Sequence, residues 1–343
     1  MSSTSAAQKT ITFNDAYRLA LDEAMAADPT VFLLGEDIAD EQGGGVFKVT
    51  KGLSTKYGRE RVRTTPISEE AIVGAAIGAA LAGMRPVAEI MLMNFVTVAM
   101  DQIVNHAAKL RFMSGGQTHV PITIRTRTGA GGGTAGQHSD MLEAWFAHVA
   151  GIKVVVPATP ADAAGLLASC IFDDDPCLVV EDMMTAGVTG PAPPSGYRVP
   201  LGRASVPREG SDVSVVGYGR PIRDALKIAE KLASEGISVE VVDLRTVSPL
   251  DTDTVLQSVG KTRRAVVVHE APRSFGVGAE VAARIQEHLY ETLSAPVLRV
   301  ASREVPVPFA KVLEQEYLYK PTAIEAAIRR TLEGKGVATR WAR

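Results

Sequence analysis

The chain has 343 residues, a length that allows two ordinary domains and a sizeable buried core. Hydrophobic residues make up 46% of it and charged residues 22%, which is the balance of a globular protein and not of a disordered one. A net charge of −3 gives no general attraction to nucleic acid or to a membrane surface, so we expect neither partner.

Cysteine usage and the N-terminus suggest a cellular location. Cys170 and Cys177 are too few for a disulfide framework and lack metal-ligand spacing, which indicates a reducing compartment. Residues 1–9 are small and polar without the apolar segment of a signal peptide, so we predict a disordered start and a cytoplasmic protein. The longest uncharged apolar run, residues 71–84, is shorter than the ~20 residues that a membrane span needs, so no transmembrane segment is expected.

The first half of the chain alternates helix and strand patterns. The predicted elements are a helix at 12–28, a strand at 31–35, a helix from Glu69 to Gly83, a strand at 86–93, a helix at 97–113, a strand at 120–126, a strand at 153–157, a helix at 159–172 and a strand at 177–181. This alternation is typical of a largely parallel sheet covered by helices on both faces. Residues 10–185 are therefore predicted to form one α/β domain.

The composition changes at residues 186–210, where five prolines interrupt any helix or central strand, and we predict a linker there. Strand and helix patterns alternate again over residues 211–335. The predicted strands are 212–217, 238–244, 265–269 and 297–300, and the helices are 222–234, 251–259 and 278–289. The second half is thus predicted to be another, smaller α/β domain.

The helix that begins at Glu69 combines acids with an almost wholly apolar body. Ser68 stands at the natural N-cap position, Glu69 and Glu70 occupy the first turn, and Gly83 is a stop signal. The helix dipole favours acids in a first turn, so a structural role for Glu69 is one interpretation. A second is that the apolar surroundings desolvate its carboxylate, raise its pKa and let it hold or donate a proton near neutrality.

A glycine-rich loop at residues 129–140 allows three interpretations. Gly131, Gly133 and Gly136 formally satisfy the GxGxxG pattern of dinucleotide sites, but the acid expected about 20 residues later is missing. The glycines could equally serve only a tight bend. In the third interpretation they let the backbone approach a cofactor while His138 projects into the site, although a lone histidine is also compatible with a hydrogen-bonded surface position.

These residues carry a family resemblance. The spacing of Glu69, Gly74 and Gly78 resembles the pyrimidine-side motif of thiamine-diphosphate enzymes. The segments 65–69, 83–86 and 100–105 resemble the beta subunit of the thiamine-dependent dehydrogenase component of 2-oxo acid dehydrogenase complexes, a transketolase-like group that includes pyruvate, branched-chain 2-oxo acid and acetoin dehydrogenases. The likeness runs from about residue 10 to about residue 332. It implies a transketolase-like pyrimidine-binding domain followed by a transketolase C-terminal domain.

The resemblance also implies roles for individual residues. Glu69 would hydrogen-bond the aminopyrimidine ring of thiamine diphosphate and so promote deprotonation of its thiazolium carbon. His138 would face the thiazolium and the reacting carbonyl. Phe95 would stack on the aminopyrimidine ring, and Met91 would also contact the cofactor. The alternative interpretation is that Phe95 is an ordinary core residue without contact to a cofactor. Glu36 and Glu89 would belong to a buried acidic channel that joins two thiamine sites.

Two ion sites follow from the same resemblance. Backbone carbonyl groups and two aspartates would form a structural potassium site. These aspartates, Asp173 and Asp175, could also lie in a solvated turn without binding an ion. The residues of this predicted site are Ile122, Cys170, Ile171, Asp173 and Asp175. The chain contains no Gly-Asp-Gly segment for a Mg²⁺-bound diphosphate, so the resemblance implies that an alpha subunit holds this end of the cofactor in an α2β2 heterotetramer.

The implied reaction is the decarboxylation of a 2-oxo acid, or the cleavage of acetoin, with transfer of the acyl unit to lipoamide on a partner acyltransferase. Two other functions remain open from the residues alone. One is a nicotinamide-dependent dehydrogenase, and the other is a non-catalytic subunit that completes a complex.

Overall fold

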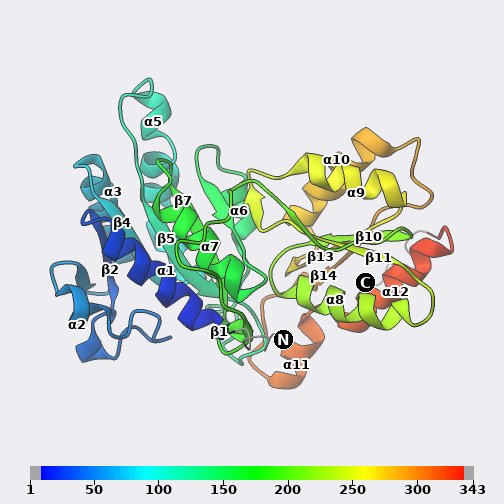
Figure 1. Cartoon of the computed structure of the whole chain (residues 1–343), viewed down its shortest axis with the longest axis horizontal. Helices are drawn as coiled ribbons and strands as arrows, with labels where there is room; N and C mark the ends of the chain where they lie inside the picture. Colours follow the sequence, from blue (N-terminus) through cyan, green and yellow to red (C-terminus); the bar gives the residue numbers. More distant parts are fainter. Residues whose placement is uncertain (1–8, 336–343) are drawn as a thin grey trace, which may run out of the picture.

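The computed structural model describes residues 9–335 and shows two α/β lobes side by side (Figure 1). Of the predicted disordered start, residues 1–8 lie outside the described residues. Within the described part of the chain, no helix is both long and apolar enough to cross a membrane. The prediction of two domains built on mostly parallel sheets is confirmed.

The first lobe contains a seven-stranded sheet with the strand order β12-β6-β7-β5-β4-β2-β3. Its strands are β2 (Val31–Glu36), β3 (Val62–Thr65), β4 (Arg85–Leu92), β5 (Thr123–Thr128), β6 (Lys153–Val155), β7 (Cys177–Asp182) and β12 (Thr246–Ser248). Its helices are α1 (Phe13–Ala27), α2 (Leu53–Tyr57), α3 (Glu69–Leu81), α4 (Met93–Val96), α5 (Leu110–Met113), α6 (Glu143–Ala147) and α7 (Pro160–Ile171). All neighbouring strands are parallel except β12, which pairs antiparallel to β6.

Side-chain alternation along these strands gives the sheet two apolar faces. Helices α1 and α7 pack on one face, and α3 packs on the other. Thr12 caps α1, since its hydroxyl accepts a hydrogen bond from the Asp15 amide at 3.1 Å. Ser68 stands at the N-cap position of α3, but its side chain makes no capping bond.

The prediction of a single helix at 97–113 is wrong. The segment instead forms a 3₁₀ turn at Thr97–Ala99, a π-helical stretch at Gln102–Ala107 and the short helix α5. In the middle stretch the Ala108 amide bonds to the carbonyl of Ile103, five residues back, at 3.0 Å. Because π-helical and α-helical turns bury similarly spaced side chains, the apolar pattern could not distinguish them.

The second lobe contains a five-stranded sheet with the strand order β14-β13-β10-β11-β9. Its strands are β9 (Ser205–Arg208), β10 (Val213–Gly217), β11 (Val239–Asp243), β13 (Ala265–Pro272) and β14 (Leu298–Ser302). Its helices are α8 (Arg220–Ala233), α9 (Thr252–Thr262), α10 (Val277–Leu289), α11 (Lys311–Tyr317) and α12 (Pro321–Leu332). Strand β9 is an antiparallel edge strand, a position that tolerates Pro207.

Several contacts join the lobes. Strand β8 (Thr189–Pro191), within the predicted linker, pairs with β1 (Thr10–Thr12) at the start of the chain. Strand β12 returns from the second half of the chain to extend the first sheet, and one apolar core continues from α3 to α10. In Figure 1, α11 lies below the junction of the two lobes. Residues of the second lobe are therefore close enough to contact loops of the first lobe directly.

Candidate active site at the carboxyl edge of the first sheet

Strands β2, β4 and β5 are parallel neighbours, so their carboxyl ends meet at one edge of the sheet. Ligands of open α/β sheets bind outside this edge. Glu36 ends β2, Phe95 follows β4 in α4, and the loop with His138 follows β5. Helix α3 begins at Glu69, shortly after the carboxyl end of β3. The topology thus gathers most of the predicted site residues at this edge.

Glu69 and Glu36 are two buried acids at this edge, and the charge of Glu69 acts on Glu36. Glu69, the first residue of α3, is only 8% exposed, and Glu36 is 9% exposed. Burial raises the pKa of Glu36, and the charge of Glu69 raises it further. Among residues 9–335, none donates a hydrogen bond to the Glu69 carboxylate. A buried carboxylate is therefore present at the predicted place with its oxygens available to a ligand.

One side of α3 consists of small residues. A Cβ at Gly74 would lie 3.3 Å from the side-chain oxygen of Gln102, so this glycine admits the π-helical stretch at close range. A Cβ at Gly78 would meet nothing within 4 Å among the described residues. Among the described residues, another segment therefore approaches this face closely at Gly74 but not at Gly78.

Phe95 and His138 are in ring contact. Their centroids lie 5.3 Å apart, and the planes meet at 77°, an edge-to-face arrangement that aromatic pairs favour. Asn94, which sequence reasoning overlooked, fixes the loop beside them, since its amide group donates to the Gly136 carbonyl at 3.0 Å and to the Asp140 carboxylate at 2.8 Å. Burial raises the pKa of Asp140, although the Asn94 bond opposes this.

The amide groups of the glycine loop bind carboxylates of the second lobe. The Ala130 amide donates to Glu270 at 2.7 Å, and the Gly131 and Gly133 amides donate to Glu314 at 2.7 Å and 3.0 Å. These donors are thus unavailable to the phosphates of a dinucleotide. In addition, the next helix, α6, begins only at Glu143, whereas a dinucleotide fingerprint leads directly into a helix. Both observations argue against the nicotinamide alternative.

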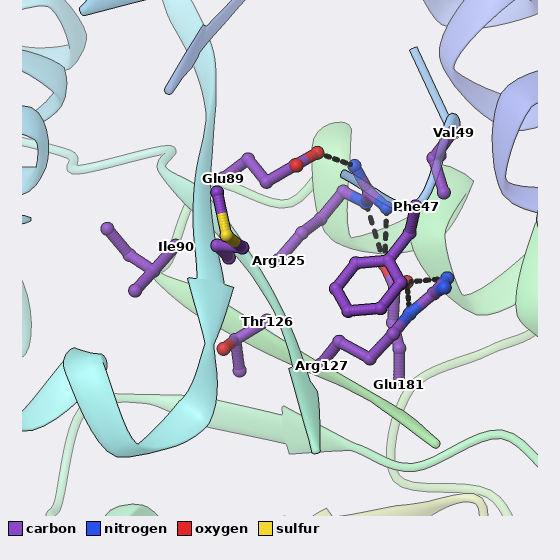
Figure 2. Close-up of a pocket in the computed structure, with 9 residues that line it drawn as sticks. Phe47, Val49, Glu89, Ile90, Arg125, Thr126, Arg127 and Glu181 are labelled. Atoms are coloured by element: carbon purple, nitrogen blue, oxygen red, sulfur yellow. Dashed lines mark hydrogen bonds and ion pairs between the residues drawn. The ribbon is translucent and has the colours of Figure 1, made fainter. Parts of the chain in front are cut away.

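Glu89 and Met91 belong to a different cluster from Glu69. Figure 2 shows Glu89 paired with Arg125, at 2.7 Å, beside a cavity of about 10 Å³ that Met91 also lines. Burial raises the pKa of Glu89, although Arg125 opposes the shift. The register between β4 and β5 shifts between Ile90 and Leu92, so Met91 lies at a β-bulge. Such bulges change the direction of side chains and are frequent near active sites.

The two predicted channel acids lie on opposite faces of the sheet. Gly35 is the register partner of Glu89, so these residues share a face, and Glu36 points to the other face by alternation. Glu89 therefore faces the side covered by α1, where Arg125 neutralises it, whereas Glu36 faces the side of α3. The sequence could not reveal this separation, because it depends on the register between β2 and β4.

Comparison with known proteins agrees with this geometry. A family model described as "Transketolase, pyrimidine binding domain" matches residues 9–186, and one described as "Transketolase, C-terminal domain" matches residues 202–324. The beta subunit of acetoin:2,6-dichlorophenolindophenol oxidoreductase of Cupriavidus necator is 46% identical over 323 residues, covering 92% of this chain and 95% of that protein. The chain belongs to the beta-subunit family of the thiamine-diphosphate-dependent dehydrogenases.

Other relatives of the family are similar over the same length. The mitochondrial pyruvate dehydrogenase E1 component subunit beta of Homo sapiens is 42% identical over 327 residues, covering 94% of this chain and 90% of that protein. A solved structure titled "Split gene transketolase, inactive beta4 tetramer" superposes with a TM-score of 0.76 over 95% of this chain and 99% of that one. Its identity of 24% shows the shared fold alone.

The five residues of the predicted potassium site carry their own partners. The Lys153 ammonium lies 2.7 Å from Asp173 and 3.3 Å from Asp175, and Arg111 also pairs with Asp175. Three of the carbonyl groups accept hydrogen bonds from within the chain. These bonds are Cys177 N to Ile122 O at 3.0 Å, Asp173 N to Cys170 O at 3.2 Å and Arg85 Nη1 to Ile171 O at 3.4 Å. The Lys153 ammonium thus neutralises the two aspartate carboxylates, and the potassium site stays a prediction.

The described residues also contain no cluster of three or more histidine, cysteine, aspartate or glutamate side chains suited to a metal ion. Within residues 9–335, the chain therefore presents groups suited to an aromatic, hydrogen-bonding ring, and no obvious ligands for Mg²⁺.

Proposed function

We propose that this chain is the beta subunit of a dehydrogenase that decarboxylates a 2-oxo acid, or cleaves acetoin, and transfers the acyl unit to lipoamide on a partner acyltransferase. The observation that carries the proposal is the buried Glu69 carboxylate, which no described residue engages by hydrogen bonding, at the carboxyl edge of the sheet. Phe95 and His138, in ring contact at the same edge, support it.

The residues present fit the pyrimidine half of thiamine diphosphate. Glu69 would accept a hydrogen bond from, or share a proton with, a ring nitrogen, and Phe95 would offer a ring to stack against. Met91 lines the separate cavity beside Glu89 and is not part of this set. When bound, the cofactor supplies a nucleophilic carbon and an electron sink.

The chain's own contribution to the reaction is to hold and move protons. Burial, and then the charge of Glu69, raises the pKa of Glu36, so the two acids interact electrostatically at this edge of the sheet. Glu69 would exchange a proton with the ring nitrogen of the bound cofactor. His138 would hydrogen-bond the oxygen of the substrate carbonyl as charge develops on it, while Phe95 limits the movement of the imidazole.

The diphosphate and its Mg²⁺ would be held mainly by an alpha subunit, with an α2β2 heterotetramer as the active assembly. The missing Gly-Asp-Gly segment is the basis for proposing this division. We expect the isolated chain to bind thiamine diphosphate weakly or not at all in calorimetry. Tight, Mg²⁺-dependent binding by the chain alone would contradict the division of the site between two chains.

The test of the function compares two adjacent acids in the reconstituted complex. Glu69→Gln should lower turnover by at least about 100-fold while subunit association is kept, since positioned acid–base groups contribute 10²–10⁴-fold. Glu70→Gln is the matched control, because Glu70 is exposed in the same helical turn. Pyruvate, branched-chain 2-oxo acids and acetoin would be assayed with 2,6-dichlorophenolindophenol as electron acceptor, and then with lipoamide. Unchanged turnover in Glu69→Gln would remove Glu69 from the mechanism and favour a structural subunit.

A further inference from the structure

Glu314 is a buried carboxylate that the function described so far does not use. It lies in α11 of the second lobe and is 1% exposed. One oxygen accepts from the Gly131 amide at 2.7 Å, and both oxygens accept from the Gly133 amide, at 3.1 Å and 3.0 Å. Within residues 9–335, no lysine, arginine or histidine forms an ion pair with it.

Burying this carboxylate away from water has an energetic cost that its hydrogen bonds must offset. A buried charge without a counter-ion is strongly disfavoured, and hydrogen bonds from several donors are what makes it tolerable. Bonds from amides to a carboxylate are also stronger than bonds between neutral groups. The loop amides are therefore bound tightly to a side chain 183 residues further along the chain.

The bound amides belong to a loop that needs to be held. Gly131 and Gly133 have φ angles of 119° and 72°, and Ala135 has a φ of 62°, which is unfavourable for a residue with a Cβ. Asn94 fixes the far side of the same loop at Gly136 and Asp140. His138 lies between Gly136 and Asp140, on the carboxyl side of the amides that Glu314 binds.

Helix α11, which carries Glu314, is also anchored by apolar packing. Tyr317 of α11 is 2% exposed and packs with Val307 and Ala130 in a small apolar cluster. We therefore expect α11 to keep its place when the Glu314 carboxylate is removed and the two loop amides are freed. This separation allows the hydrogen bonds to be tested apart from the fold.

We propose that Glu314 is a positioning residue for His138: its carboxylate, presented by the second lobe, fixes the glycine loop so that the imidazole stays at the site edge against Phe95. The inference rests on the role of His138 in the proposed function. It assigns the second lobe a part in catalysis, because the group that orients the loop comes from α11.

The test uses the assembled enzyme with Glu314→Ala, Glu314→Gln and the control Glu316→Gln. Glu316 is on the same helix, but it is exposed and paired with Arg303 and Lys320. Glu314→Ala should lower kcat by about 10–100-fold with KM unchanged, as expected for a displaced catalytic group. Glu314→Gln should retain part of the rate, because an amide oxygen still accepts hydrogen bonds, and Glu316→Gln should match the wild type.

Two further measurements distinguish positioning from general damage. Hydrogen exchange at the Gly131 and Gly133 amides should become faster in Glu314→Ala and stay unchanged in Glu316→Gln. Combining Glu314→Ala with His138→Ala should add little to the loss caused by His138→Ala alone, because both changes act on one group. Equal losses with and without His138 would overturn the inference, as would unaltered amide exchange. Wild-type turnover in His138→Ala, together with fast exchange in Glu314→Ala, would instead refute the proposed function of His138.

Discussion

Replacing Arg125 with methionine should destabilise the chain strongly. Arg125 is 3% exposed and bridges Glu89, at 2.7 Å, and Glu181, at 2.6 Å. Glu181 keeps a second partner in Arg127, at 2.8 Å, so Glu89 is the group left buried without a cation. Breaking a buried ion pair by removing one partner costs about 3–5 kcal/mol, and we expect the lower end because Glu89 retains 13% exposure.

The assay is urea unfolding of the chain at a fixed protein concentration, followed by intrinsic fluorescence. Adding Glu89→Gln to Arg125→Met should recover at least about 1 kcal/mol of the loss, because it removes the uncompensated charge. Arg59→Met is the control, since the Arg59–Glu41 pair is solvent-exposed, and it should stay within about 0.5 kcal/mol of the wild type. The reasoning would be refuted by a loss below about 1 kcal/mol in Arg125→Met, or by no recovery on adding Glu89→Gln.

Two other predictions concern the charged groups of Lys153 and Glu270. If the Lys153 ammonium replaces a metal cation between Asp173 and Asp175, the thermal stability of the wild type should be the same in potassium and in sodium buffer. The Lys153→Met variant should then be more stable in potassium than in sodium. Potassium-dependent stability of the wild type would instead support the predicted metal site. Burial, opposed by Arg220, raises the pKa of Glu270 from 4.5 to about 7, so its contribution to stability is complete below pH 4.5 and is lost as the pH rises through 7. Denaturant titrations of Glu270→Gln should therefore show a smaller fall in the free energy of unfolding over this pH range than the wild type shows; an identical fall would assign the pH dependence to another group.

Much of the site followed from short stretches of chain. Glu69 stands next to the residues that define its helix, and Phe95 and His138 follow strands with clear patterns, so their common location could be predicted from the parallel order of β4 and β5. The residues that hold them were less accessible. Asn94 gave no pattern of its own, and Glu270 and Glu314 lie far along the chain from the loop that they bind.

Local patterns in the amino-acid sequence determine the alternation of helices and strands, the two-lobed α/β class and the burial of Glu69, because apolar periodicity and helix termini are properties of neighbouring residues. Only the tertiary structure places Glu36 and Glu89 on opposite faces, puts the Lys153 ammonium between two aspartates and brings Glu314 to the loop of His138. Each of these depends on strand register or on the packing of one lobe against the other, and such long-range pairings leave no periodic signal in the sequence.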